Sequence, residues 1–215
     1  MIPVFETGLV EDGRIRLRLR HLARLAASGA PRERVADVAA ALDELVARPD
    51  QPFTARIDVR DGGIEVRTRP PRLTDPVDLP VHRSYDPALG IRRLKISDRT
   101  WAEAIEAECG GEALLVSPAG LVGETTRAAV MCVRADGRLV VPPLEGILAS
   151  VTRAWAVDET GAAEEELRLD DLLAARGAAI LTAGGGVIPI ASVDGAALAR
   201  DPLFDALQER WRALP

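Results

Sequence analysis

The chain has 215 residues, of which 47% are hydrophobic and 28% charged, and its formal net charge is −6. This balance is typical of a soluble globular protein, and the arginines are dispersed rather than clustered, so nucleic acid is not an expected partner. No apolar run approaches the roughly 20 residues that a membrane-spanning helix requires, and the N-terminus lacks the basic start of a signal peptide. We therefore expect a cytoplasmic protein with no membrane partner.

Cysteine and histidine are scarce, which argues against two common classes of enzyme. The cysteines are Cys109 and Cys132 and the histidines are His21 and His82, and their spacing matches no metal-ligand pattern. A serine hydrolase requires a histidine base and usually a G-x-S-x-G turn, and the sequence has no such turn. We expect neither a metal site nor a hydrolase triad.

In the first half, strand and helix patterns alternate and end in a proline-rich segment. The patterns predict a β-hairpin over 4–19, a short helix ending near Gly29, a second helix from Pro31 and a second hairpin over 53–69. Five prolines then fall between residues 70 and 87, which is typical of a linker. We expect two domains, over residues 1–88 and 89–215.

The second half is predicted to mix strands and helices in the same way. A helix is expected from about Asp98 to Cys109, and Thr100 and Glu103 have the spacing of a capping box. Further helices are expected over 146–157, 169–177 and 203–214, with strands between them. Hairpins followed by helices favour an α+β fold of two domains with mostly antiparallel or mixed sheets.

Lys95 is the single lysine of the chain, although lysine and arginine together number 27. Arginine stays protonated in proteins, whereas a buried lysine can lose its proton and act as a nucleophile. A lysine kept at one position therefore indicates chemistry that arginine cannot perform. The alternative is a surface lysine without a role.

Three other features suit a phosphorylated, electron-withdrawing cofactor. Glu124 follows a predicted strand and could face a ring nitrogen. Thr152 lies in a predicted helix near its start, where backbone N–H groups favour a phosphate. The consecutive glycines Gly184, Gly185 and Gly186 offer backbone N–H groups with no side chain in the way.

Five segments of the sequence carry a resemblance to a known family. In chain order they are VFETGLVEDGRIRLRLRHLARLAASG, LKISDR, EALLVSPAGLVGETT, PPLEGILASVTR and AAILTAGGGVIPIASVDG. Over about residues 4–195 the chain resembles the class IV aminotransferases, the pyridoxal-phosphate enzymes of fold type IV. That family includes branched-chain and D-amino acid aminotransferases and 4-amino-4-deoxychorismate lyases. The resemblance implies pyridoxal 5'-phosphate (PLP) as cofactor and a homodimer.

The resemblance also implies roles for individual residues. Lys95 would form a Schiff base with the cofactor and move protons between cofactor and substrate. Glu124 would pair with the ring nitrogen and keep it protonated, which makes the ring a better electron sink. The cofactor phosphate would be bound by Arg24, Val151, Thr152, Gly184 and Gly185.

The reaction and the substrate stay open between alternatives. A transaminase acting on a small amino acid and a lyase that releases pyruvate from aminodeoxychorismate to give 4-aminobenzoate share the same first steps. A third alternative is a family member that no longer catalyses and serves as a binding or scaffold protein, because Ala129 stands where the family often has asparagine. Candidate substrate-binding residues are His82, Arg83, Tyr85, Arg92, Arg56 and Arg60.

Overall fold

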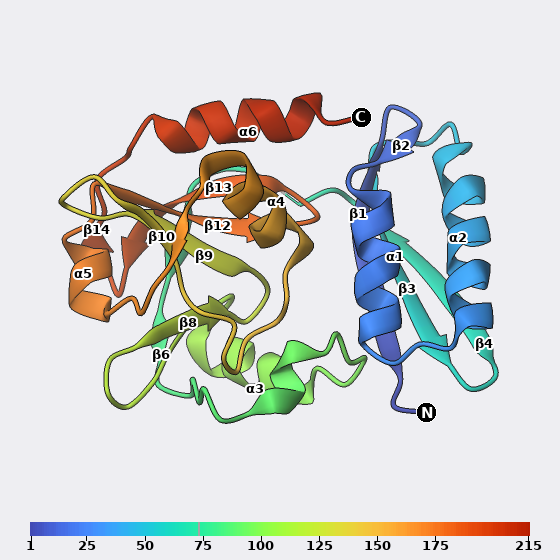
Figure 1. Ribbon diagram of the computed structural model, residues 1–215, viewed down its shortest axis with the longest axis horizontal. Helices are drawn as coiled ribbons and strands as arrows, with labels where there is room; N and C mark the ends of the chain where they lie inside the picture. The colour runs from blue at the N-terminus through green and yellow to red at the C-terminus, as the bar shows by residue number, and fades with distance from the viewer. Residues whose placement is uncertain (73) are drawn as a thin grey trace.

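The computed structural model describes residues 1–72 and 74–215 and shows two lobes, each built on its own sheet (Figure 1). The smaller lobe contains the first third of the chain, and the larger lobe contains the rest. The fold is α+β with mostly antiparallel strands, so the predicted fold class is confirmed.

The small lobe is a four-stranded antiparallel sheet of order β2-β1-β3-β4, covered on one face by two helices. Its elements are β1 (Val4–Glu11), β2 (Arg14–Ile15), α1 (Arg18–Ala27), α2 (Arg32–Val46), β3 (Phe53–Arg60) and β4 (Gly63–Arg69). Because strand side chains alternate between faces, Val10, Ala55 and Ile57 pack against Leu25 and Leu42 of the helices. The opposite face of the sheet is left without a helix, and it carries Thr54, Arg56 and Arg67 together with the apolar Phe5 and Leu9.

The large lobe is a ten-stranded sheet whose main path runs β14-β13-β12-β9-β8-β7-β6. Its strands are β5 (Val77–Leu79), β6 (Val81–His82), β7 (Leu114–Val116), β8 (Val122–Thr125), β9 (Ala129–Val133), β10 (Leu139–Val141), β11 (Ala163–Glu164), β12 (Gly177–Thr182), β13 (Gly186–Val193) and β14 (Ala196–Ala197). Its helices are η1 (Gly90–Arg93), α3 (Thr100–Cys109), α4 (Val151–Thr160), α5 (Leu169–Leu173) and α6 (Leu203–Ala213).

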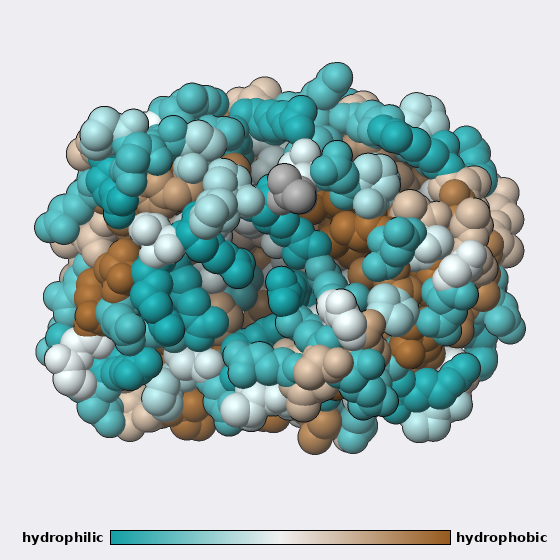
Figure 2. Space-filling model, turned by 180° about the vertical axis from the view of Figure 1, so that it is seen from behind, coloured by the Kyte–Doolittle hydropathy of each residue, from teal (hydrophilic) through white to brown (hydrophobic). Residues whose placement is uncertain are grey.

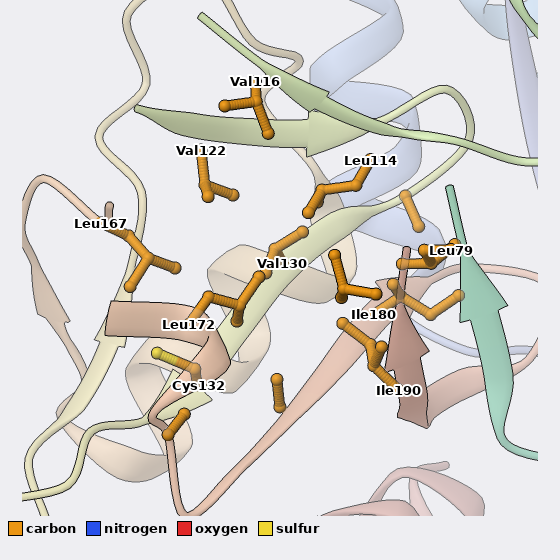
Figure 3. Close-up of a cluster of buried hydrophobic side chains, with 14 of the residues drawn as sticks. Leu79, Leu114, Val116, Val122, Val130, Cys132, Leu167, Leu172, Ile180 and Ile190 are labelled. Carbon is orange, nitrogen blue, oxygen red and sulfur yellow. The ribbon is translucent and has the colours of Figure 1, made fainter. Parts of the chain in front are cut away.

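The large sheet is buried on both faces, and each face has its own core. One cluster gathers Leu114, Val130 and Ile180 from neighbouring strands, as Figure 3 shows. The other cluster lies under α4 and α6, where Trp155 and Trp211 meet edge to face with ring centroids 5.3 Å apart. Strands buried on both sides read as continuous apolar runs, which explains why β9 has the sequence AVMCV.

Strand pairing bears on where one lobe ends and the other begins. β5 pairs in parallel with β13 and β6 with β7, so residues 77–82 belong to the large sheet. The ranges 1–88 and 89–215 stay a prediction of domain organisation, and the pairing favours a boundary within 70–76.

The structure differs from the predicted elements at four places, one of which is α5: it ends at Leu173 although a helix is predicted over 169–177, because Gly177 already begins β12. The second strand of the first hairpin ends at Ile15 because Leu17 adopts a left-handed conformation and α1 begins directly after it. The capping box at α3 does not form, since Asp98 and not Thr100 accepts the hydrogen bond at the helix start. The helix predicted from Gly146 begins only at Val151. Gly146 has φ 65°, and a Cβ there would clash with the Asp86 carbonyl oxygen.

In the part of the chain that the structure describes, no helix combines the length and the apolar character that a bilayer crossing requires.

Candidate active site

Lys95 lies where the two lobes meet and is held by backbone contacts to the small lobe. Its carbonyl oxygen accepts a hydrogen bond from Phe5 N at 2.9 Å, and its own N–H donates to Ser28 Oγ at 3.1 Å. The ammonium nitrogen Nζ lies 4.6 Å from the centroid of the Phe5 ring. Strand β1 and helix α1 therefore fix this segment of the large lobe against the small lobe.

The surroundings of Lys95 favour a neutral amine. Burial lowers the pKa of Lys95 to about 7, and the positive charges of Arg24 and Arg99 act in the same direction. The carboxylates of Glu6 and Glu124 oppose this shift without cancelling it. A substantial fraction of the Lys95 amine is therefore unprotonated near neutral pH, as a nucleophile or proton acceptor must be.

Arg24, on α1, belongs to a buried network that fixes its guanidinium. Its Nε and Nη2 donate to the two carboxylate oxygens of Glu6, each at 2.7 Å, and its Nη1 lies 3.5 Å from the Ala149 carbonyl oxygen. His21 Nδ1 lies 2.6 Å from Glu6 Oε2. The pKa of Glu6 is held well below its usual range by Arg24 and His21, although burial alone would raise it. The two hydrogen bonds to Glu6 fix the guanidinium so that its Nη1 points toward the loop that precedes α4.

Glu124, on β8, is a buried carboxylate close to the same positive charges. Its side chain is 7% exposed, and its Oε2 accepts a hydrogen bond from Leu148 N at 3.2 Å. Burial raises the pKa of Glu124 to about 7, against the opposing effects of the Leu148 hydrogen bond and of Arg92, Arg99 and Lys95. A buried carboxylate of this kind gains most from a cationic partner such as a protonated ring nitrogen.

The start of α4 offers groups that suit a phosphate. Thr152 is fully buried, and among the described residues its Oγ1 has no hydrogen-bond partner. The first-turn N–H groups of a helix, here those of Val151 and Thr152, have no intrahelical acceptor and attract anions. An unpartnered buried hydroxyl beside such a helix start fits the phosphate of PLP, which would supply the missing acceptor.

The glycine turn approaches the small lobe instead of the start of α4. The Ala183 carbonyl oxygen accepts a hydrogen bond from Leu9 N at 3.3 Å, and a Cβ on Gly184 would lie 3.8 Å from Thr54 Oγ1. Gly185 contributes its carbonyl oxygen to Gln208 Nε2 at 2.9 Å. Among the described residues, no hydrogen bond joins this turn to Thr152 or Arg24, so its part in phosphate binding stays a prediction.

The structure gives most of the candidate substrate-binding residues other partners. Arg56 is paired with Asp58, Arg60 with Glu65 and His82 with Glu108. Tyr85 is buried, and its hydroxyl donates to the Glu145 carbonyl oxygen at 2.7 Å. Arg92 lies 4.3 Å from the Trp101 ring centroid and near Glu124. Arg83 has no ion pair among the described residues.

Sequence reasoning assigned no role to Glu6, His21 and Arg99, which the structure places in or beside the site. Glu6 is the middle residue of the F-E-T segment, and a carboxylate in an otherwise apolar strand is the signal that could have identified it. Arg99 lies four residues after Lys95, and its Nη2 donates to the Thr126 carbonyl oxygen. Its charge affects the pKa of both Lys95 and Glu124.

Comparison with solved structures shows where this fold occurs. The structure superposes on the PLP-bound form of a hypothetical aminotransferase from Mycobacterium tuberculosis with a TM-score of 0.83 and 25% identity, covering 98% of this chain and 88% of the other. A 4-amino-4-deoxychorismate lyase from Pseudomonas aeruginosa gives 0.74 at 25% identity, with 98% and 90% covered.

A further protein has the same fold at a lower sequence identity. A putative 4-amino-4-deoxychorismate lyase from Legionella pneumophila gives a TM-score of 0.84 at 19% identity, covering 99% of this chain and 91% of the other. No curated protein matches the sequence. The sequence model described as "Amino-transferase class IV" matches residues 3–193. The chain therefore belongs to the class IV aminotransferase family, whose members are PLP-dependent enzymes.

Proposed function

We propose that this chain is an aminotransferase that acts on a small amino acid and that Lys95 both holds PLP and transfers the proton at the substrate Cα. The observation that carries the proposal is the environment of Lys95, whose pKa is lowered to about 7 at the junction of the two lobes. A lysine without a role would be solvated and protonated at neutral pH.

The group that would carry the proton is the amine nitrogen Nζ of Lys95. PLP, when bound, withdraws electrons from the substrate and so stabilises negative charge at its Cα. Neutral Lys95 Nζ would accept the Cα proton. Burial lowers the pKa of this amine, and the positive charges of Arg24 and Arg99 act in the same direction. The Glu124 carboxylate would accept a hydrogen bond from the protonated ring nitrogen and so keep that nitrogen protonated.

The remaining groups would orient the cofactor. Thr152 Oγ1 and the first N–H groups of α4 would bind the phosphate, with Arg24 adding charge from the other lobe. The glycine turn at Gly184 and Gly185 would contribute backbone N–H groups only. With partners drawn from both lobes, the phosphate would tie α1 to α4.

A lyase is the second candidate, because two of the similar structures are described as 4-amino-4-deoxychorismate lyases. The same neutral lysine would then accept the Cα proton of a substrate from which pyruvate leaves, and the resulting ammonium would give the proton back. A non-catalytic scaffold is the less supported alternative. Ala129 is buried in β9, and Lys95, Arg24 and Glu124 keep a polar, charged site beside it.

We also propose that the protein acts as a cytoplasmic homodimer. Met1, Ile2 and Ile91 are exposed apolar side chains that border one open hollow with Pro3 and Ile96, which a second copy could cover. Sedimentation of the purified protein tests this, and a monomer at micromolar concentration would contradict it.

One experiment separates the two reactions and tests catalysis itself. The PLP-loaded protein is incubated with a panel of amino acids, with and without an added 2-oxo acid, and with aminodeoxychorismate. An aminotransferase produces a new 2-oxo acid only when an acceptor is supplied, whereas a lyase releases pyruvate without one. If the loaded protein turns over neither substrate class, the result contradicts the proposed catalysis and supports the non-catalytic scaffold.

A further inference from the structure

Three ionisable side chains of the small lobe are buried together, away from the surface where such groups usually lie. Figure 2 shows hydrophilic residues over much of the face that it presents. Glu6, His21 and Arg24 lie beneath the surface instead, and they are 5%, 3% and 9% exposed. We call these three residues the Glu6 cluster. Ionisable groups are seldom buried unless they are paired or have a function.

Stability alone does not account for the Glu6 cluster. Taking two charges out of water costs about as much as their attraction returns, and apolar side chains of similar size often serve a core equally well. Apolar side chains are close at hand, because Glu6 and His21 border a small cavity together with Ile15, Leu22 and Leu42. The cluster therefore requires an explanation other than packing.

The carboxylate of Glu6 fixes the orientation of the Arg24 guanidinium. Its Oε1 accepts a hydrogen bond from Arg24 Nε and its Oε2 one from Arg24 Nη2, each at 2.7 Å. Two parallel hydrogen bonds hold the plane of a guanidinium, whereas a single one would let it rotate. The fork on Glu6 therefore determines where the third nitrogen, Nη1, can lie.

His21 provides a further hydrogen bond to Glu6 without adding charge. Burial would raise the pKa of Glu6, but Arg24 and His21 hold it well below its usual range, so the carboxylate is ionised and can only accept. Burial lowers the pKa of His21 in spite of that carboxylate, so the ring is neutral near pH 7. The 2.6 Å contact of His21 Nδ1 with Glu6 Oε2 therefore places the ring's hydrogen atom on Nδ1.

Arg24 Nη1 is the part of the guanidinium that Glu6 leaves free. It has two N–H groups, and its only hydrogen bond among the described residues is a long one, at 3.5 Å, to the Ala149 carbonyl oxygen. Ala149 precedes Val151, the first residue of α4, by two positions. The free N–H groups therefore lie beside the loop that leads to Thr152, whose buried Oγ1 also lacks a partner in the part of the chain that the structure describes.

We propose that Glu6 is a positioning residue for Arg24, and that His21 secures Glu6, so that Arg24 Nη1 is presented to the phosphate of PLP at the start of α4. This inference rests on the proposed function, because it takes the phosphate as the ligand of Arg24. A free arginine side chain would lose rotamer freedom when it binds an anion, and the fork on Glu6 removes that cost in advance. Glu6 and His21 act through Arg24 and do not touch the cofactor.

The test compares PLP with pyridoxal, which has the same ring and aldehyde but no phosphate. Dissociation constants for both are measured on the cofactor-free protein from the absorbance of the bound cofactor. Glu6→Asp keeps the charge and withdraws the carboxylate by one methylene group, which breaks the fork. It is expected to weaken PLP binding about tenfold, the effect of one charge-assisted hydrogen bond, and to leave pyridoxal binding unchanged.

A matched control makes the same change at an exposed glutamate of the small lobe. Glu44→Asp, on α2, is expected to alter neither affinity. If Glu6→Asp weakens PLP and pyridoxal binding equally, the residue serves the fold as a whole, and the proposal is overturned. Unchanged affinity for both compounds in Glu6→Asp would overturn it as well.

A double-mutant cycle shows whether Glu6 acts through Arg24. Arg24→Gln removes the group that Glu6 is proposed to position, so adding Glu6→Asp to that variant is expected to cause no further loss of PLP affinity. A further tenfold loss in the double variant would show that Glu6 acts independently of Arg24 and would refute the positioning role.

His21 provides a second variant, which keeps an aromatic ring in the buried site should Glu6→Asp not fold. His21→Phe removes the Nδ1–H donor and is expected to weaken PLP binding about threefold, with pyridoxal binding unchanged. His21→Asn is expected to restore PLP binding, because its amide nitrogen is attached to the same carbon position as Nδ1. Wild-type PLP affinity in His21→Phe would contradict the proposal.

Failure of this inference differs from failure of the proposed function. A wild-type protein that does not bind PLP, or binds it no more tightly than pyridoxal, contradicts the phosphate site itself. A wild-type protein that prefers PLP, with Glu6 and His21 variants that keep the full preference, contradicts the positioning role alone.

Discussion

At the scale of single residues, the site consists of ionisable groups whose pKa values are moved toward neutrality. Lys95 is shifted down and Glu124 is shifted up, and both have a pKa of about 7. Burial is the main cause in each case, because it disfavours whichever form is charged. Two oppositely shifted groups in one site are typical of acid–base chemistry near neutral pH.

The Glu124 shift predicts how stability depends on pH in the cofactor-free protein. A carboxyl group with a raised folded-state pKa stabilises the fold below pH 4.5, and this contribution is lost as pH rises through about 7. Glu124→Gln removes the buried charge. As pH rises from 5 to 8, the free energy of unfolding of this variant should therefore increase by about 2 kcal/mol relative to that of the wild-type protein. Lys95 titrates in both proteins, but loss of the Glu124 carboxylate lowers the Lys95 pKa further, so the measured difference includes this coupling.

Urea unfolding of both proteins at pH 5 and pH 8 measures that difference. A gap between Glu124→Gln and wild type that is the same at both pH values would show that the Glu124 carboxyl is not buried in this way.

The identities of the central residues can be predicted from the sequence, but their pairing cannot. Lys95 is marked by its singularity, and Arg24, Glu124 and Thr152 by the motifs around them. The Arg24–Glu6 pair depends on how β1 lies beside α1, and which side chains meet across the second hairpin depends on the register of β3 and β4. A shift of one residue in that register would turn these side chains to the other face, and local patterns do not fix it.

At the scale of elements, helix α4 carries the proposed phosphate site at its first turn. Thr152→Val keeps the shape of the side chain and removes a hydroxyl that has no partner among the described residues. We expect the stability of the cofactor-free protein to be unchanged or slightly higher, and the affinity for PLP to fall roughly tenfold. Thermal unfolding and a PLP titration measure the two effects.

The same helix provides a matched control for this prediction. Thr160 is at the end of α4, and its Oγ1 donates to the Ala156 carbonyl oxygen at 2.6 Å. Thr160→Val should cost about 1 kcal/mol of stability and leave PLP affinity as it is. If both valine variants affect PLP binding equally, the loss comes from the helix as a whole and not from Thr152.

Most helices and strands can be predicted from the periodicity of the sequence. The predicted and observed boundaries differ where a loop sets the end of an element. Alternation correctly predicts the β3–β4 hairpin, and apolar spacing correctly predicts α2 and α6. The late start of α4 has a local signal in Ser150, whose Oγ accepts a hydrogen bond from Arg153 N at 3.3 Å and caps the helix, but the course of residues 146–149 does not follow from local sequence. That loop is set by the close approach of Gly146 to Asp86, a contact between segments distant in sequence.

At the scale of the whole molecule, the two lobes have separate cores but several joining contacts. Besides the Phe5–Lys95 hydrogen bond, Arg16 Nη2 donates to the Arg212 carbonyl oxygen at 3.0 Å, which ties β2 to the end of α6. The small lobe has only about 70 residues, and domains of that size gain little stability alone. We infer that the lobes support each other.

This inference predicts a single cooperative unfolding transition. All three tryptophans, Trp101, Trp155 and Trp211, lie in the large lobe, so tryptophan fluorescence reports on that lobe alone. Far-ultraviolet circular dichroism reports on both lobes. The two thermal transitions should coincide, and PLP should raise both by the same amount because it would contact α1 and α4 together. Loss of dichroism before fluorescence would show that the small lobe unfolds independently.

The central claim is that Lys95 holds the cofactor, and the scarcity of amines makes one measurement decisive. The only primary amines of the chain are Lys95 Nζ and the amino terminus. The protein is mixed with PLP near neutral pH, reduced with borohydride and mapped by peptide mass spectrometry. The account predicts one reduced PLP adduct per chain, on the peptide that contains Lys95, and none on that peptide in Lys95→Arg. An unmodified Lys95 peptide, with the adduct at the amino terminus or absent, would contradict it.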